Sequence, residues 1–355
     1  MNTNPRSYRI LCIGEMWLGS NARAFFLALR RLGHSIQLID EHLYNPAPWR
    51  SIPLRIIRKT LRPLLVRELC LEAKRLADIF HPHGVFVFKG NAVHPDLIRF
   101  FQARGIPVVN FYPDVSFWAH GPYIPRALPL YDHIFTSKSW GIKDMQEQLG
   151  INNSSFLEHG FDPELDHPLL ISDDERTRYC CDVVFIGTWS PKKEKLLAYL
   201  KRALPAVRLM IWGCQWEKSF APELVSSIVG DEIIGDAYSK ALQAASICLG
   251  ILSEARTGAR SGDTITSRTF NIPACGAFLL HERNAESVNY FKEDEEAAFF
   301  ETPEELVQRV SFYLDHPLRR EEVAKKGRER CLISGYSIDD RVKHIIEWFD
   351  NRIHA

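Results

Sequence analysis

Residues 256–280 read RTGARSGDTITSRTFNIPACGAFLL, a polar loop followed by a short helix and an apolar strand. The loop carries two glycines, the spacing of apolar residues predicts a helix over 266–274, and a Cys-Gly turn leads into a predicted strand over 277–280. Free N–H groups at the start of such a helix favour phosphate, and Arg268 adds a bidentate donor within the first turn. The alternative is that the glycines only form a loop and that Arg268 makes a surface salt bridge.

The same alternation of strand and helix runs through the rest of the chain. In the amino-terminal half, short apolar runs predict strands at 8–13, 35–39, 84–88, 108–111, 133–136 and 156–157. The carboxyl-terminal half repeats the pattern, with strands predicted at 182–186, 208–212, 247–251 and 277–280. Helices are predicted between these strands, and three more close the chain at 303–315, 318–331 and 339–352. Two consecutive βα arrays predict an α/β protein of two Rossmann-like domains facing a central cleft.

A change in composition marks the boundary between the two arrays. Residues 161–178 are rich in prolines and acids and lack strong periodicity, which is typical of a linker. We therefore expect an amino-terminal domain at 1–160 and a carboxyl-terminal domain at 179–335. The final segment, 336–355, is predicted to be a helix that returns to the amino-terminal domain.

Composition excludes several classes of protein. The chain has 355 residues, with 46% hydrophobic and 25% charged residues, which is typical of a globular protein. The 44 Lys and Arg balance the 44 Asp and Glu, so no basic field favours nucleic acid as a partner. The polar start Met1–Tyr8 is no signal peptide, and no run of 18 apolar residues predicts a membrane span. The eight cysteines form no Cys-x-x-Cys pair, which favours reduced thiols in the cytoplasm.

A family resemblance rests on the stretch quoted above. Asp263-Thr264-x-x-Ser267-Arg268-x-Phe270-x-Ile272-x-Ala274-Cys275-Gly276-x-Phe278-Leu279-Leu280 resembles the hallmark of CgeB-like glycosyltransferases of the GT-B superfamily, the type known as glycosyl transferases group 1. Supporting pieces resemble the same family in the expected order: 136–162, Asp182–Thr188 and Gly235–Tyr238. The resemblance implies a GT-B fold, with acceptor bound by the amino-terminal domain and a nucleotide-diphosphate sugar bound by the carboxyl-terminal domain. It also implies a hexosyltransferase-like, metal-independent enzyme of surface polysaccharide or other glycoconjugate synthesis, with no cofactor.

The resemblance assigns donor-binding roles to Tyr238, Asp263, Thr264, Ser267 and Arg268. Retaining members of the superfamily place two glutamates eight positions apart across this loop and helix, and the second binds the nucleotide ribose. Here the two positions are Asp263 and Asn271. Asn271 can still hydrogen-bond a ribose hydroxyl, although it carries no charge.

The loop after the first strand of the carboxyl-terminal half is the second donor-site candidate. The predicted strand ends at Gly187, and Thr188, Lys192 and Lys193 follow it. A departing diphosphate needs cationic stabilisation as the glycosidic bond breaks, which a lysine here could supply. The alternative is that both lysines belong to a solvated helix start.

In the amino-terminal domain, three predicted strand ends reach the expected cleft: Gly14–Asn21, Lys89–Asn91 and Tyr112–Asp114. A transfer with inversion needs a base for the acceptor hydroxyl, and Asp114 or His120 could serve. For Asp114 the alternative is a turn or a helix cap. The sequence predicts no metal site, because no apolar strand ends in Asp-x-Asp and the histidines around Pro82 are more typical of a loop.

Residues 50–67 contain six basic residues and no acidic one. Arg55, Arg58, Lys59 and Arg62 would share one face of a helix, a pattern typical of an amphipathic helix on anionic lipid. A helix packed on its own domain has the same pattern. Because Pro63 is expected to end the helix within three turns, any contact with the inner face of a membrane would be weak.

We therefore expect a glycosyltransferase that uses a nucleotide-sugar donor and a saccharide, lipid-linked or protein acceptor. One alternative is a GT-B nucleotide-sugar epimerase. A second is a non-catalytic binding protein with the same fold, which the asparagine at position 271 motivates.

Overall fold

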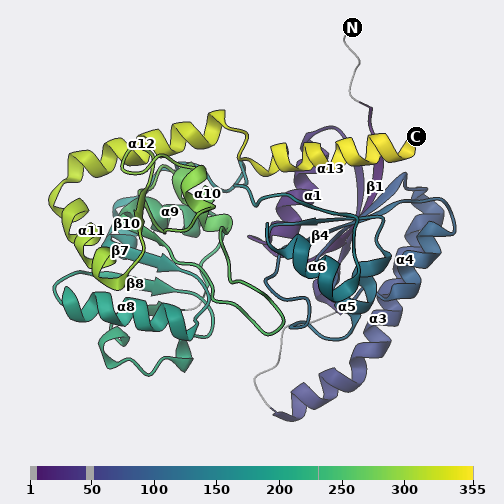
Figure 1. Cartoon of the computed structure of the whole chain (residues 1–355), viewed down its shortest axis with the longest axis horizontal. Helices are drawn as coiled ribbons and strands as arrows, with labels where there is room; N and C mark the ends of the chain where they lie inside the picture. Colours follow the sequence, from purple (N-terminus) through teal and green to yellow (C-terminus); the bar gives the residue numbers. More distant parts are fainter. Residues whose placement is uncertain (1–5, 45–51, 231, 355) are drawn as a thin grey trace, which may run out of the picture. The chain divides into compact units, whose positions relative to one another are not determined.

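The computed structural model describes residues 6–44, 52–230 and 232–354, and only the backbone for 52–59. The chain divides into two compact units (Figure 1). The first unit comprises residues 1–158, 255–261 and 338–355, and the second comprises 159–254 and 262–337. Each unit contains a six-stranded, fully parallel sheet, which confirms the predicted α/β class.

The first sheet has the strand order β2-β1-β3-β4-β5-β6. Its strands are β1 (Arg9–Gly14), β2 (Ser35–Asp40), β3 (Gly84–Phe88), β4 (Val108–Tyr112), β5 (His133–Thr136) and β6 (Ser154–Phe156). Its helices are α1 (Asn21–Arg31), α2 (Glu41–Tyr44), α3 (Ile52–Phe80), α4 (Pro95–Gln102), α5 (Tyr123–Ala127), α6 (Gly141–Leu149) and α13 (Ile338–Ile353), and a short 3₁₀ turn follows α5 at Leu128–Leu130.

Alternate residues of the inner strands of the first sheet enter different cores. Leu11 and Val85 pack into one core, with α3 and α4, whereas Ile10 and Phe86 pack into the other, with α1 and α13. This period of two is expected of strands that are covered on both faces. The last helix lies alongside the first, and Arg31 binds Asp339 through its Nε at 3.0 Å across 308 positions (Figure 1).

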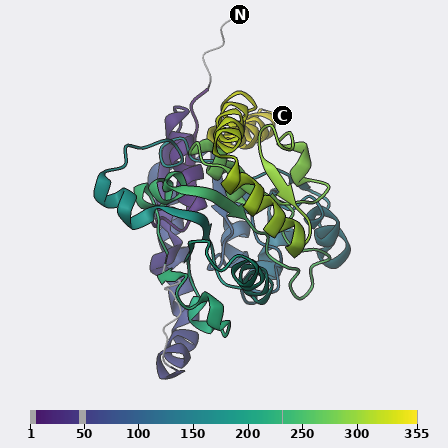
Figure 2. The same cartoon turned by 90° about the vertical axis from the view of Figure 1, so that its left-hand side faces the viewer.

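Helix α3 is much longer than the sequence predicts. It runs through Pro63 and continues to Phe80, so the prediction that Pro63 ends it is wrong. The proline removes one intrahelical hydrogen bond, and the carboxyl-terminal turns compensate by burying apolar side chains such as Val66 and Leu69. The amino-terminal turns extend beyond the edge of the first sheet (Figure 2). Arg62 turns inward and donates from Nη2 to the carbonyl oxygens of Asn91 (3.1 Å) and His120 (3.2 Å), so it does not belong to a lipid-facing charged face.

The other basic side chains of the 50–67 segment, at positions 50, 55, 58 and 59, lie outside the described residues. No helix among the described residues is long and apolar enough to cross a membrane.

The second sheet has the order β12-β11-β10-β7-β8-β9. Its strands are β7 (Cys181–Ile186), β8 (Leu209–Trp212), β9 (Ile228–Gly230), β10 (Ala245–Gly250), β11 (Leu279–Glu282) and β12 (Ala298–Phe300). Its helices are α7 (Asp173–Tyr179), α8 (Pro191–Ala203), α9 (Asp236–Ala244), α10 (Ser267–Ala274), α11 (Pro303–Asp315) and α12 (Pro317–Ile333), with 3₁₀ turns at Trp216–Lys218, Pro222–Leu224 and Ser287–Asn289. Helix α8 packs on one face of this sheet with α11, and α9 lies on the other face, where Leu242 accepts from the Cys248 thiol at 3.2 Å (Figure 1).

The units depart from the expected domain bounds in two places. Residues 161–178, expected to be a linker, belong to the second unit, and helix α7 begins within them behind a Ser172 cap that binds Glu175. Residues 255–261 leave the second unit and pack in the first, where Arg260 donates from Nε to Asp144 at 2.6 Å. A continuous prediction of 179–335 missed this excursion because the ion pair joins residues 116 positions apart.

Candidate functional site

The topology of the second sheet singles out two loops. Strand β7 pairs with β8 on one side and with β10 on the other, so the strand order changes direction between β7 and β10. In open parallel sheets, ligands bind beyond the carboxyl ends of the strands at such a point. The loops that begin there are 187–190 after β7 and 251–254 after β10, and the first is the loop that the sequence predicted.

Arg268 lies beside the first of these loops. It stands in the first turn of α10, and its Nη1 is 3.0 Å from the point where a Cβ on Gly187 would lie, so only glycine fits there without displacing the guanidinium. Nη2 donates to the carbonyl oxygen of Ile251 at 3.0 Å, whereas Nε is shielded from solvent without a hydrogen-bond partner among the described residues. Burial lowers the pKa of Arg268, since desolvation disfavours the cation, and Tyr238 and Asp263 oppose this effect.

Lys193 is the second cation near this loop. It is only 4% exposed, and its Nζ donates to the carbonyl oxygen of Thr188 and to Ser253 Oγ, both at 3.1 Å. The ring of Phe185 lies 6.0 Å from Lys193 Nζ and 5.6 Å from Arg268 Cζ. The structure therefore places two cations, from α8 and α10, around the end of β7.

Lys192 points elsewhere. Its Nζ binds Glu282 Oε1 at 2.5 Å and the carbonyl oxygen of Leu252 at 3.3 Å. The two adjacent lysines thus differ in partner and in exposure, as the 100° between neighbouring helical positions requires. Lys192 is an ion-pair partner at the rim of the site.

Glu254 was missed by the sequence analysis. Its carboxylate accepts from Ser190 Oγ at 2.7 Å and from the Lys192 amide at 3.4 Å, so it caps the start of α8. Although burial opposes ionisation, these hydrogen bonds and the charge of Lys193 lower the pKa of Glu254. Side chains therefore cap the starts of both helices, Ser190 and Glu254 at α8 and Thr269 at α10, and Arg268 stands in the first turn of α10.

The remaining predicted donor residues lie on α9 and on the loop before α10. Tyr238 Oη donates to Asn271 Oδ1 at 3.0 Å, which joins the two residues predicted to contact the nucleotide. The amide of Asp263 donates to the carbonyl oxygen of Ser253 at 2.9 Å, so Asp263 lies beside the loop after β10. Thr264 Oγ1 is buried without a partner among the described residues, and Ser267 is the first residue of α10.

A buried histidine fixes the start of α10. His281 Nδ1 donates to its neighbour's carbonyl oxygen, that of Glu282, at 2.7 Å, so Nε2 is left to accept from Thr269 Oγ1 at 2.9 Å. Thr269 Oγ1 in turn accepts from the amide of Thr266, the residue before the helix, at 3.0 Å. Burial lowers the pKa of His281 to about 4, so the ring is neutral at pH 7 and its tautomer is set by these partners.

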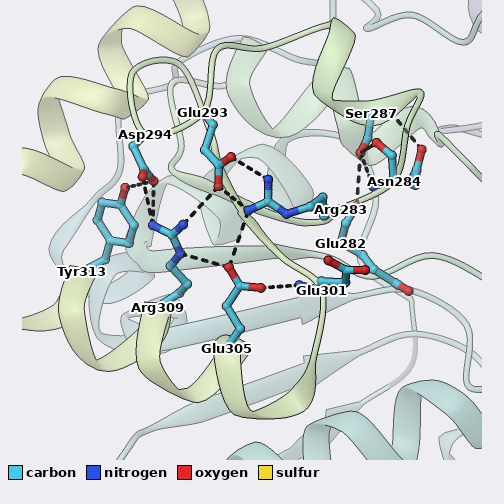
Figure 3. A network of polar contacts seen from close by, with 10 residues as sticks. All are labelled: Glu282, Arg283, Asn284, Ser287, Glu293, Asp294, Glu301, Glu305, Arg309 and Tyr313. Atoms are coloured by element: carbon cyan, nitrogen blue, oxygen red, sulfur yellow. Dashed lines mark hydrogen bonds and ion pairs between the residues drawn. The ribbon is translucent and has the colours of Figure 1, made fainter.

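Beyond β11, two arginines join a separate network, shown in Figure 3. Arg283 donates from Nη1 to Glu293 at 2.6 Å, and Arg309 donates from Nη1 to Asp294 at 2.9 Å. Glu305 lies 3.5 Å from Arg283 and 3.6 Å from Arg309. Because three carboxylates surround two guanidinium groups, this network ties the segment before β12 to α11 and attracts no further anion.

In the first unit, the predicted candidates Asp114 and His120 lie together after β4. His120 Nε2 is 2.9 Å from Asp114 Oδ2, and Lys89 Nζ is 2.8 Å from the same oxygen. Although burial alone would raise it, these two groups hold the pKa of Asp114 well below its ordinary range. Asp114 is therefore a poor base, and His120 is the other candidate of the pair for that role.

Glu41 lies at the same edge of the first sheet and is 1% exposed. Its Oε1 accepts from the Ala92 amide, and its Oε2 is buried without a partner among the described residues. Burial raises the pKa of Glu41 to about 8, which nearby Lys89 and Arg62 only partly offset. Among the described residues, no group of three or more His, Cys, Asp or Glu side chains is arranged to hold a metal ion.

Comparison with known proteins adds to this geometry. A family model described as glycosyl transferase-like matches residues 192–347. No curated protein matches the chain. Several solved structures match nearly its whole length. Sucrose-phosphate synthase from Thermosynechococcus elongatus has a TM-score of 0.65 at 13% identity, and the alignment covers 98% of this chain and 99% of that one.

Two further structures are similar. A glycosyltransferase from Rickettsia africae has a TM-score of 0.66 at 10% identity, over 98% of this chain and 99% of that one. Anabaena HepE in complex with UDP-glucose has a TM-score of 0.63 at 10% identity, over 97% of this chain and all of that one. These likenesses establish the GT-B fold that the sequence predicted.

Proposed function

We propose that the protein is a glycosyltransferase that moves a sugar from a nucleotide-diphosphate donor to an acceptor hydroxyl. The observation that carries this proposal is the state of Arg268 at the switch point of the second sheet. The Nε of this buried guanidinium has no hydrogen-bond partner among the described residues, and burial disfavours its charge although Asp263 and Tyr238 partly offset the effect, so a diphosphate would supply acceptors and further negative charge. The glycosyl transferase-like match over 192–347 supports the same function.

In this proposal the donor lies on the second unit. Arg268, Lys193 and the start of α10 would hold the diphosphate, close to the backbone of Gly187 and Thr188. Asn271 and Tyr238 would hydrogen-bond the ribose, with Asp263, Thr264 and Ser267 lining the same loop. The two cations stabilise the charge that develops on the diphosphate as the glycosidic C–O bond breaks, which is the role a metal ion has in metal-dependent transferases.

The first unit would supply the base. The acceptor hydroxyl attacks the anomeric carbon, the bond to the diphosphate breaks, and His120 takes the hydroxyl proton. Asp114 would orient the imidazole through Nε2, which leaves Nδ1 to receive that proton. This assignment predicts transfer with inversion, and the 2.9 Å distance between His120 Nε2 and Asp114 Oδ2 supports it.

The acceptor class is proposed from the resemblance alone. We infer a saccharide, a lipid-linked or a protein acceptor, in the synthesis of surface polysaccharide or another glycoconjugate by a CgeB-like enzyme of the cytoplasm. Leu61 and Leu64 are 41% and 57% exposed on α3, which supports a weak contact of this helix with the inner face of a membrane.

The donor site is tested by thermal shift with UDP, GDP, ADP, CMP and dTDP. A nucleotide at about 100 times its dissociation constant should stabilise the protein by roughly 2.7 kcal/mol. Arg268→Gln should lower the affinity for the cognate nucleoside diphosphate about tenfold to a hundredfold, the cost of a lost charge-assisted contact. The affinity for the nucleoside without phosphate should stay the same. Arg176→Gln, at an exposed position of α7, is the matched control and should change neither affinity. Equal losses for nucleotide and nucleoside would show that Arg268 supports the fold instead.

A further inference from the structure

Lys89 follows β3 at the edge where β1 and β3 are neighbours, which is the switch point of the first sheet. Its backbone has φ 65°, a left-handed conformation that is rare for a residue with a side chain, and Gly90 after it has φ 87°. Strand β4 holds this turn from both sides of the peptide. The Lys89 amide donates to the Phe111 carbonyl at 2.8 Å, and Asn110 Nδ2 donates to the Lys89 carbonyl at 3.2 Å.

This strained turn presents the ammonium to the proposed base pair. Lys89 Nζ and His120 Nε2 share one oxygen, Asp114 Oδ2, at 2.8 and 2.9 Å. The three side chains are only 23%, 29% and 30% exposed, for Lys89, His120 and Asp114 respectively, so solvent screens them incompletely. Burial opposes the ammonium, but Asp114 holds the pKa of Lys89 above its ordinary value, so the ammonium stays charged.

Other charged groups face this centre from three elements. Glu15, in the loop after β1, and Glu41, on α2, both act on Lys89, and Arg62 reaches the backbone of His120 from α3. Glu41 carries little charge at pH 7 because its pKa is about 8. Asp114 is therefore the anion that Lys89 chiefly compensates.

We propose that Lys89 is a positioning residue that neutralises Asp114, so that the aspartate can orient His120 without converting it to the imidazolium. A carboxylate next to an imidazole normally favours the charged ring, and a charged ring cannot accept a proton. With Lys89 on the same oxygen, the close contact between Asp114 and His120 is kept and most of that electrostatic bias is removed. This inference rests on the proposed function only in taking His120 as the base.

The experiment is an NMR titration of protein labelled with ¹³C at histidine Cε1, with the His120 resonance assigned by its loss in His120→Gln. In Lys89→Met the His120 titration midpoint should rise by roughly 1–2 pH units, the shift expected from an uncompensated carboxylate in contact. Lys89→Arg keeps the charge and should restore the wild-type midpoint. Lys143→Met, at an exposed lysine of α6 in the same unit, should leave it unchanged. An unchanged midpoint in Lys89→Met would overturn the inference.

A second variant covers the case in which Lys89→Met does not fold. Asp114→Asn leaves Lys89 without its anion, and the His120 midpoint should then fall below that of the wild type. A midpoint that stays the same or rises would contradict the proposed coupling. Because the titration reads the imidazole in the free protein, it stands even if no transferase activity is found, and such a failure would refute the proposed function alone. If transfer occurs, the acid limb of its pH profile in Lys89→Met should move up by the same amount as the NMR midpoint.

Discussion

Replacing Glu41 by glutamine should make the protein progressively more stable than wild type as the pH rises. The wild-type carboxyl is buried, and its pKa rises from 4.5 in the unfolded chain to about 8 in the folded protein. The folded state therefore binds this proton more tightly than the unfolded state. The stability that the protonated carboxyl contributes is fully present below about pH 4.5 and is lost as the pH rises through about 8.

The size of the effect follows from the two values. A difference of about 3.5 pH units, at about 1.36 kcal/mol each, corresponds to a limit of about 5 kcal/mol. Between pH 5 and pH 9 the linkage relation gives about 4 kcal/mol of this. Glutamine has nearly the same shape and can accept from the Ala92 amide, but it does not titrate, so the free-energy difference between the two proteins isolates Glu41.

The assay is urea denaturation of both proteins at pH 5, 7 and 9, followed by circular dichroism. The difference in unfolding free energy should grow by about 4 kcal/mol over this range in favour of the glutamine variant. Glu329→Gln, at an exposed position of α12, should show no such trend. A difference that stays constant from pH 5 to pH 9 would mean that Glu41 is already ionised in the folded protein, and the electrostatic description of this edge of the first sheet would fail.

Three further predictions concern the second unit. In calorimetry, Lys193→Gln should lower the affinity for the cognate nucleoside diphosphate at least tenfold, because Lys193 Nζ lies at the end of β7. Lys192→Gln should change this affinity less than threefold, because Lys192 binds Glu282. Equal effects would contradict the different placement of the two lysines. Asn271→Glu should keep the hydrogen bond from Tyr238 and hold or improve donor affinity by up to about fivefold, since a charged acceptor is stronger than a neutral one; loss of binding at an unchanged melting temperature would refute the ribose assignment. Gly213→Ala should lower both the melting temperature and the affinity for the nucleotide, because Gly213 has φ 136° and a Cβ there would collide with the Gly187 carbonyl oxygen. A substitution that changes neither quantity would show that this loop is free to move.

The sequence predicts the regular parts of this fold well, because each strand is a short apolar run bounded by turn residues. Strands 84–88 and 133–136 and helix 303–315 have the predicted bounds. The sequence analysis missed strands β9 and β12. Each has only three residues and lies at a sheet edge, and three residues are too few to show an alternation of apolar and polar side chains. The predicted helix was shorter than α3 because the prediction considered only the local effect of Pro63. The buried turns after Pro63 stabilise the longer helix.

The site was predictable only where a motif or a strand end marked it. Arg268 and Gly187 were found separately, and the structure adds their close approach. Glu254 and Glu41 carry no local signal, since their roles depend on partners 62 and 51 positions away. Lys89 lies at a strand end that the sequence singled out, but its pairing with Asp114 depends on the register of β3 and β4, which no single segment encodes.

The central claim is tested most directly by following nucleoside diphosphate release and product mass together, with a panel of nucleotide sugars and saccharide acceptors. Glycosyl transfer predicts that nucleoside diphosphate appears in equal amount to an acceptor heavier by one sugar residue, only when acceptor is present, and that Arg268→Gln reduces both. Conversion of the nucleotide sugar into an isomer of the same mass, with no acceptor needed, would indicate an epimerase instead. Tight binding of the nucleotide sugar with neither product would contradict a catalytic role and leave a binding protein with the GT-B fold.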